Sequence, residues 1–107
     1  MENKSLDIAQ NLQDINRLVH EPSRLMILAI LNAVESADFL YLLRETQLTK
    51  GNLSSHLAKL EEGGLVEIEK TFQGKIPLTI CRLTKEGRSA FETYRKQMQT
   101  FFNQTSG

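Results

Sequence analysis

Residues 49–60, which read TKGNLSSHLAKL, are the stretch that decides the fold we expect. On an ideal helix, Leu53, Leu57 and Leu60 lie within about 60° of one another, and this spacing predicts a face that packs into a core. Thr49 suits the position before the helix, because its hydroxyl can accept a hydrogen bond from a free N–H of the first turn. The remaining surface carries small polar residues and cations without an acid: Lys50, Gly51, Asn52, Ser54, Ser55 and Lys59.

The polar face of this helix suits the major groove of duplex DNA. Asparagine can pair with adenine, serine with a base or a phosphate, and lysine with guanine or a phosphate. Gly51 costs roughly 1 kcal/mol of helix propensity against alanine, and a close approach of the backbone to a ligand would explain that cost. The free N–H groups of a helix N-terminus also favour phosphate. A solvated first turn is the alternative explanation, because polar residues are common there.

After this helix the periodicity changes from helical to alternating. Gly63 and Gly64 predict the end of the helix. Residues 65–72, LVEIEKTF, alternate apolar and polar side chains, which is typical of a half-exposed strand. Residues 76–83, IPLTICRL, predict a second strand with Ile76, Leu78 and Ile80 on one face. Pro77 fits only an edge or a strand start, where no ladder N–H is needed.

Polar and basic residues gather at the turn between these strands. Gly74 provides the turn, and Lys70, Gln73 and Lys75 cluster around it. Such a tip can lie along the phosphate backbone or enter the minor groove beside the helix. A hairpin tip that is merely solvated is the alternative, but the helix face and the tip together favour DNA.

Helical periodicity covers most of the remaining chain. Ile8, Leu12, Ile15 and Val19 recur at steps of four, three and four and predict a first helix. Residues 23–34 predict a core helix after Pro22, residues 39–47 a short helix after Asp38, and Thr84 caps a long final helix. Along that last helix an apolar seam is formed by Phe91, Tyr94, Met98 and Phe101.

The order of these elements is that of a winged helix-turn-helix. We expect a mainly α fold with a small β-hairpin and with extended N- and C-terminal dimerisation helices. One DNA-binding domain is expected over residues 1–107. Its parts are the terminal helices at 1–20 and 84–104, the helix-turn-helix at 38–62 and the wing hairpin at 65–83.

The apolar stripes of the two terminal helices predict a homodimer. The outer helices carry more apolar surface than a small three-helix core needs, and burying an exposed Phe or Leu is worth roughly 1.5–3 kcal/mol. The alternative is that the stripes cover one another within a monomer. A two-fold dimer demands a near-palindromic operator. The expected interface residues are Ile8, Leu12, Ile15, Val19, Phe91, Tyr94, Met98 and Phe101.

The overall composition is that of one ordinary globular domain. Of 107 residues, 40% are hydrophobic, and 13 acidic residues balance 13 basic ones, which argues against indiscriminate binding of nucleic acid. The balance is uneven: residues 1–48 hold seven acidic and four basic residues, whereas residues 49–88 hold five acidic and seven basic. The segment with the proposed DNA-binding face is therefore mildly basic.

We expect a cytoplasmic protein without a membrane segment. The N-terminal MENKSLDIAQ has no export signal, and the longest apolar run, residues 25–31, is far too short to span a bilayer. The single cysteine, Cys81, cannot form an internal disulfide. It reads as a packing residue, with a redox sensor as the alternative, and His56 reads as a hydrogen-bonded structural histidine.

Two stretches carry a family resemblance. Residues 22–31, PSRLMILAIL, and 48–87, LTKGNLSSHLAKLEEGGLVEIEKTFQGKIPLTICRLTKEG, resemble winged-helix transcriptional regulators of the MarR and ArsR type. The chain is most similar to the short stand-alone winged-helix DNA-binding proteins of bacteria and archaea, over about residues 15–98. The resemblance implies a homodimer held by its terminal helices, with the recognition helix at 49–62 in the major groove and the wing on the flanking backbone.

The same resemblance also marks departures. ArsR-like members often carry serine where this chain has Gly51. The cysteine-rich metal motif of the arsenic and cadmium sensors is absent, because positions 39–45 read FLYLLRE. We therefore expect no metal and no cofactor. A small-molecule effector is compatible with the family, but no polar constellation selects its class.

An enzyme is not expected, because the chain has no phosphate-binding glycine loop, nucleophile elbow, metal spacing or convincing acid–base pair. The competing function is a winged helix that binds protein and no DNA. The zero net charge is the best support for that alternative.

Overall fold

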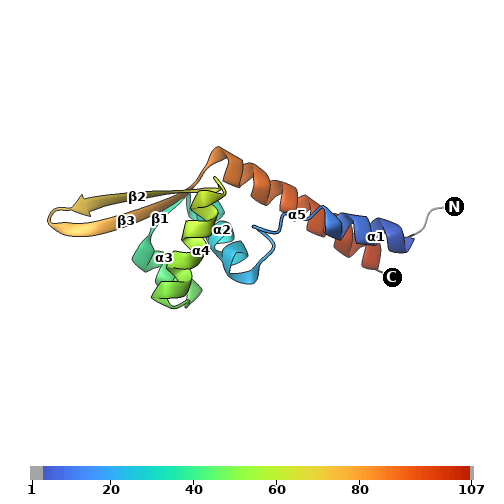
Figure 1. Ribbon diagram of the computed structural model, residues 1–107, viewed down its shortest axis with the longest axis horizontal. Coiled ribbons are helices and arrows are strands. Elements are labelled where there is room, and N and C mark those ends of the chain that lie inside the picture. The colour runs from blue at the N-terminus through green and yellow to red at the C-terminus, as the bar shows by residue number, and fades with distance from the viewer. Residues whose placement is uncertain (1–3, 107) are drawn as a thin grey trace.

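A computed structural model describes residues 4–106 and shows a central body with two projections (Figure 1). The molecule measures 66 × 25 × 21 Å with a radius of gyration of 16.5 Å, against about 13 Å for a compact domain of this length. One projection is a β-hairpin, the wing (residues 66–83). The other is the arm, residues 4–13 packed beside residues 95–105, and the rest of the chain is the body.

The observed elements confirm the expected fold class, a mainly α winged helix-turn-helix with a small sheet. In chain order they are α1 (Lys4–Gln13), α2 (Pro22–Val34), β1 (Ser36–Asp38), α3 (Phe39–Thr46), α4 (Lys50–Glu62), β2 (Val66–Gln73), β3 (Ile76–Leu83) and α5 (Lys85–Thr105).

The predicted hairpin is part of a three-stranded antiparallel sheet with the order β1-β3-β2. The short strand β1 pairs only with the last part of β3, from Asp38 opposite Ile80 to Ser36 opposite Arg82. Pro77 lies beyond the end of β1, where β3 has a neighbour on one side only. It therefore occupies an edge position, as the sequence predicts.

The two faces of the sheet differ in burial. Ile68 and Cys81 are cross-strand partners on the face that packs against the core, and Cys81 has no exposed surface. Leu78 and Ile80 share the opposite face, where they line a shallow pocket of about 360 Å³ with Val34. The apolar set of the second strand thus points away from the core.

The core of the body is formed where α2 and α4 meet. Ile27 and Leu28 of α2 are fully buried, and so are Leu53 and Leu60 of α4. Leu57 is 2% exposed, so all three predicted leucines of α4 face inward. The inward half of the recognition helix is confirmed.

Threonine caps and glycine stops bound the helices as predicted. Thr49 Oγ1 accepts a hydrogen bond from the N–H of Asn52 at 3.1 Å, and Thr84 Oγ1 accepts one from the N–H of Gly87 at 2.9 Å. Helix α4 ends at Glu62, and Gly64 follows with a φ of 78° that favours glycine.

The predicted length of the first helix is wrong. Helix α1 ends at Gln13, and residues 14–21, the junction segment, turn across the body without helix. Asn16 explains the change: its Oδ1 accepts hydrogen bonds from the N–H groups of Leu18 and Val19, at 2.9 and 3.3 Å. Such a side chain offers the backbone an alternative to the helix. Residues 1–3 of the expected terminal helix 1–20, and residue 107, lie outside the described residues.

Three residues expected at the dimer interface belong instead to the core of the single chain. Val19 is fully buried, and Ile15 and Tyr94 are each 6% exposed. The junction segment folds Ile15 and Val19 inward, and Tyr94 packs behind it with its hydroxyl 2.8 Å from His20 Nδ1. These side chains stabilise the protomer and leave no surface for a partner.

Candidate nucleic-acid interface

The outward face of α4 is open to solvent. Every residue expected on it is exposed: Thr49, Lys50, Gly51, Asn52, Ser54, Ser55 and Lys59. None of these side chains is needed to fill the core, which the leucines on the opposite face supply. The helix can therefore present this row to a ligand without unfolding.

Gly51 illustrates how open this surface is. A methyl group added at its Cα would have no neighbour within 4 Å. The fold itself therefore gives no steric reason for glycine at this position, although glycine weakens a helix by roughly 1 kcal/mol. A close approach of another molecule to the backbone would account for it.

A groove joins α4 to the base of the wing. It has a volume of about 670 Å³, and its polar lining includes Ser54, Glu61, Lys70 and Thr79. The structure thus brings the helix residue Ser54 and the wing residue Lys70 together. Glu61 places a negative charge toward the C-terminal end of α4, so a polyanion is favoured nearer the N-terminal end, where the helix dipole is positive.

The tip of the wing lies at the far end of the molecule from the arm (Figure 1). Gln73 and Lys75 are exposed there, beyond the groove, and Gly74 makes the turn with a φ of 64°. The sequence does not predict how exposed the apolar residues here are: Phe72 is 68% and Ile76 69% exposed. The tip is therefore a second surface, apolar and basic, separate from the helix face.

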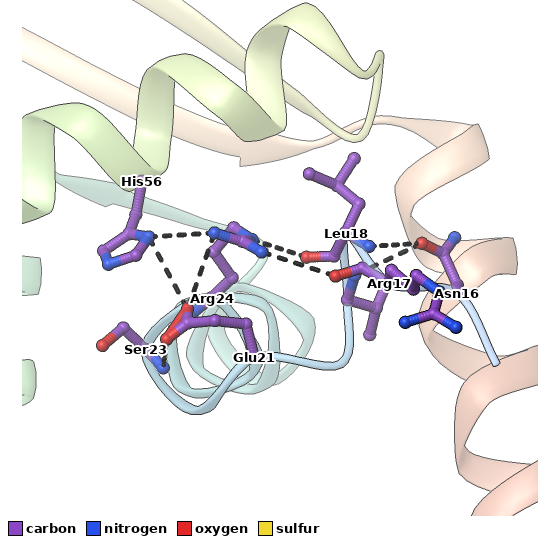
Figure 2. Close-up of polar contacts among 8 residues, drawn as sticks. Asn16, Arg17, Leu18, Glu21, Ser23, Arg24 and His56 are labelled. Carbon is purple, nitrogen blue, oxygen red and sulfur yellow. Dashed lines mark hydrogen bonds and ion pairs between the residues drawn. The ribbon is translucent and has the colours of Figure 1, made fainter. Parts of the chain in front are cut away.

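A polar network beneath α4 was not foreseen (Figure 2). Arg24 in the first turn of α2 donates from Nε to the carbonyl of Leu18 at 2.6 Å and from Nη2 to that of Arg17 at 3.4 Å. Its Nη1 lies 3.3 Å from Nδ1 of His56 on α4, whose ring nitrogen is also 3.6 Å from Glu21 Oε2. His56 is thus a hydrogen-bonded structural histidine, as expected.

Glu21 completes this network as the N-cap of α2. Its two carboxylate oxygens accept from the N–H groups of Ser23 and Arg24, both at 2.9 Å. Burial raises the pKa of Glu21, but those two amides and the charges of His56 and Arg24 outweigh it, so the pKa lies below the ordinary value. The carboxylate is therefore held in its ionised form.

One sequence signal could have revealed Arg24. A cation in the first turn of a helix faces the positive end of the helix dipole, which is unfavourable. Its presence there indicates specific partners, here two carbonyls and a carboxylate. The usual N-cap residues are Ser, Thr, Asp and Asn, so Glu21 gave no comparable signal.

Cys81 is buried, as a packing residue should be. Burial raises the pKa of its thiol to about 11, and the nearby carboxylates of Glu61 and Asp38 add to the effect. A thiol that stays protonated and enclosed is a poor nucleophile, which argues against the redox alternative.

The arm carries apolar side chains that its own two helices leave uncovered. Leu12 is 39% and Phe102 58% exposed, while Ile8 and Phe101 are half-buried. A hydrogen bond of 2.7 Å from Asn11 Nδ2 to Gln104 Oε1 holds α1 against α5. Phe91 and Met98, also expected at the interface, pack against the core of the body. The exposed apolar surface of the arm thus extends from Leu12, beside the junction with the body, to Phe102 near the end of α5.

Within residues 4–106, no cluster of three or more His, Cys, Asp or Glu side chains is arranged to hold a metal ion. Over the same residues, no helix combines the length and the apolarity that a membrane crossing requires.

The comparisons with known proteins agree with this geometry. A protein family described as winged helix DNA-binding domain matches residues 23–102. A protein of Methanocaldococcus jannaschii, described as uncharacterized, is 46% identical over 72 residues, which are 66% of this chain and 77% of that protein.

Solved structures extend the similarity to nearly the whole chain. A transcriptional regulator homologue from Pyrococcus horikoshii OT3 superposes with a TM-score of 0.83 at 27% identity, over 88% of this chain and 95% of that one. A MarR-family transcriptional regulator from Silicibacter pomeroyi shares the fold, with a TM-score of 0.65 at 22% identity, over 94% of this chain and 67% of that one.

Proposed function

Because the chain belongs to the family of winged helix DNA-binding domains, we propose that it is a sequence-specific transcriptional regulator that binds double-stranded DNA as a homodimer. Its family and fold are those of a regulatory DNA-binding protein rather than of an enzyme. In the proposed complex α4 lies in the major groove and the wing contacts the flanking backbone.

The outward face of α4 is the observation that carries this proposal. Its residues are exposed, uncharged or cationic, and held on a helix whose other side is fixed in the core. Asn52, one residue after the open position at Gly51, is placed to read a base edge, while Lys50 and Lys59 suit phosphates.

The wing supports the proposal through position and charge. Lys70 shares the groove beside Ser54, so a phosphate strand that follows α4 would pass this ammonium group. Gln73 and Lys75 extend the polar surface to the wing tip. Residues 38–62 would thus act as the helix-turn-helix and residues 65–83 as the wing.

The arm supports the homodimer. Leu12 and Phe102 expose apolar surface on a thin two-helix projection, and a second copy would cover it. We propose Ile8, Leu12, Phe101 and Phe102 as the centre of that interface. A two-fold dimer would read a near-palindromic operator with half-sites about 34 Å apart, one turn of the duplex.

Selection of bound sites from a random duplex library tests the proposal most directly. The expected result is a near-palindromic consensus with one preferred spacing, and an affinity that falls with salt. A protein making Z phosphate contacts should show a log–log slope of about −0.9Z. The proposed DNA-binding function is wrong if no sequence is enriched from the library and any binding is insensitive to salt.

A protein-interaction module is the competing function, and two observations favour it. The net charge of the chain is zero, and Phe72 and Ile76 present apolar surface at the wing tip. The salt titration separates the two, because a module of that kind should bind random duplex hardly at all. Among the variants, Asn52→Ala should change sequence preference, whereas Lys75→Ala should weaken binding evenly across sequences.

A further inference from the structure

The junction segment, residues 14–21, connects the arm to the recognition helix. It follows α1 directly and runs across the body to α2. Hydrogen bonds and packing hold it against α5 on one side and against α2 and α4 on the other. Together with α5, which runs from the body into the arm, it is therefore a part of the chain through which the position of the arm can determine the position of α4.

On the side of the arm, α5 holds the segment at two points. Gln97 Nε2 donates a hydrogen bond to the carbonyl of Asp14 at 3.2 Å. Tyr94 Oη lies 2.8 Å from Nδ1 of His20, and the two rings are in contact with centroids 5.6 Å apart. The two ends of the segment are thus fixed to the same helix.

On the side of the recognition helix, Arg24 is the first link. Its guanidinium bonds two consecutive carbonyls of the segment, those of Arg17 and Leu18, and reaches His56 in the middle of α4. The side chain is only 12% exposed. Figure 2 shows the planar group lying between the segment and the helix. Only arginine presents several donors in one rigid plane.

Leu18 also makes the second link, through its side chain rather than through the carbonyl that Arg24 bonds. Its side chain packs against Gly63, at the C-terminal end of α4, so closely that a methyl group at Gly63 would overlap Leu18 Cδ2. The backbone of Gly63, with φ −77° and ψ 0°, is accessible to any residue. Glycine at this position thus allows Leu18 to pack closely, and its backbone conformation does not require it.

We propose that Arg24 is a positioning residue that fixes α4 relative to the arm and thereby sets the separation of the two recognition helices in the dimer. Leu18 against Gly63 is the second contact of the same device. The inference rests on the proposed homodimer, and it adds that spacing specificity comes from residues that touch no DNA. Loss of Arg24 leaves the outward face of α4 intact but lets it tilt against the arm.

A distance measurement in the free dimer tests this without DNA. A nitroxide is attached to Ser55→Cys on the exposed face of α4, and the distance between the two labels is measured by pulsed electron spin resonance. Cys81 is buried and its thiol pKa is raised to about 11, so the label reacts with the introduced cysteine. The parent dimer should give one narrow distance distribution.

Variants of Arg24 test the first link. Arg24→Gln should broaden or shift the distribution, and Arg24→Lys should recover it only in part, because an ammonium cannot bridge two carbonyls and His56 at once. The matched control is Arg88→Gln, which removes a 3.1 Å bond from α5 to Asn32 of α2 and leaves the junction untouched. This control should keep the narrow peak.

The second link gives a test that does not depend on the stability of the arginine variants. Gly63→Ala should broaden the distribution by displacing Leu18, and Leu18→Ala should broaden it by leaving a gap. The double variant removes the Leu18 atoms that the new methyl group would overlap, and that methyl group refills part of the gap, so the peak should be narrower than in either single variant. Recovery in the double variant cannot arise from a general loss of stability.

Selection from duplexes with varied half-site spacing gives the functional readout. In the parent, affinity should be higher for the best half-site spacing than for a spacing one base pair longer. In Arg24→Gln the ratio of these two affinities should fall toward one, while affinity for a single half-site is retained. If the labelled parent protein shows no measurable distance between two labels, then it is not a dimer, and both the proposed homodimer and this inference are wrong. A parent peak that stays equally narrow in Arg24→Gln and in Gly63→Ala would overturn the inference alone.

Discussion

The body and the arm differ in how completely they bury their apolar residues. In the body, Leu53 and the side chains around it have no exposed surface, and the helix caps are satisfied within the chain. In the arm, Leu12 and Phe102 are 39% and 58% exposed although the helices that carry them are well formed. The body is complete as a protomer, whereas the arm leaves apolar surface that the proposed homodimer would cover.

This difference indicates that different residues specify the fold of the protomer and its assembly with a second copy. The leucines of α4 and α2 determine which fold forms, since each finds its partners within the protomer. In the proposed homodimer, the apolar stripe of the arm would determine which assembly forms, since a two-helix layer cannot enclose its own apolar surface. Removing a residue from each region should therefore give different kinds of defect.

The largest effect is expected from Phe102→Asp on the arm. Burying this ring contributes about 1.5–3 kcal/mol per copy, so two copies amount to about 3–6 kcal/mol, or roughly 10²- to 10⁴-fold in the dimer dissociation constant. Sedimentation equilibrium measures that constant. The control is Phe72→Asp, which alters an even more exposed ring on the wing and should leave dimerisation unchanged. Equal dimerisation in both variants would contradict the proposed interface.

In the body, Leu53→Ala should reduce the free energy of unfolding by about 2–5 kcal/mol, because it leaves a cavity in a packed core. Leu40→Ala is the matched control, since Leu40 is 68% exposed on α3, and a surface change of this kind usually stays within about 0.5 kcal/mol. Chemical denaturation measures both. If the two variants lose similar amounts of unfolding free energy, then the buried position of Leu53 contributes no more to stability than the exposed position of Leu40.

The contrast between body and arm also explains what could be read from the sequence. Thr49, Thr84 and Gly64 were predictable because caps and glycine stops act within a few residues of the chain. The leucine face of α4 was predictable because its period matches the helix. These signals are local, and they lie mostly in the body and at the start of α5.

One misreading has a partly local cause and the other a long-range cause. Ile15 and Val19 continue the helical period of α1, yet Asn16 turns the backbone and the core takes both side chains. The three residues of β1 are too few to show alternation, and they form a strand because β3 is available to pair with them. The third strand has no sequence signal of its own, and the junction network shows one only at Arg24, a cation in the first turn of α2.

Two glycines allow a test at intermediate size. Gly87→Ala would push a methyl group into the backbone carbonyl of Leu65, where α5 meets the body. Overpacking of this kind costs about 1–3 kcal/mol of stability. Gly51→Ala meets nothing and should stabilise the protein by about 1 kcal/mol through helix propensity. Thermal or chemical unfolding of the two variants should thus shift in opposite directions.

Gly51→Ala also bears on function. If the backbone of α4 approaches a duplex at this residue, the variant should bind its selected operator more weakly even though it is more stable. A variant that is more stable and binds equally well would show that Gly51 is not a point of close approach, while leaving the rest of the α4 face in place.

The smallest effect is expected at the boundary between body and arm, from the N-cap carboxylate of Glu21. Its pKa in the folded protein lies below the ordinary value of 4.5. A lowered pKa means that the ionised carboxylate stabilises the fold fully above about pH 4.5, and that this contribution is lost as the pH falls through the folded value. Glu21→Gln removes the titrating group but keeps one oxygen for capping, so at neutral pH it should cost up to about 1 kcal/mol of stability.

Unfolding measured at pH 7 and at pH 3 should show that the difference in stability between parent and variant is smaller at the lower pH. A difference that is constant with pH would mean that the ionised form has no advantage in the folded state, and the junction would then depend on Arg24 and its carbonyl partners rather than on Glu21.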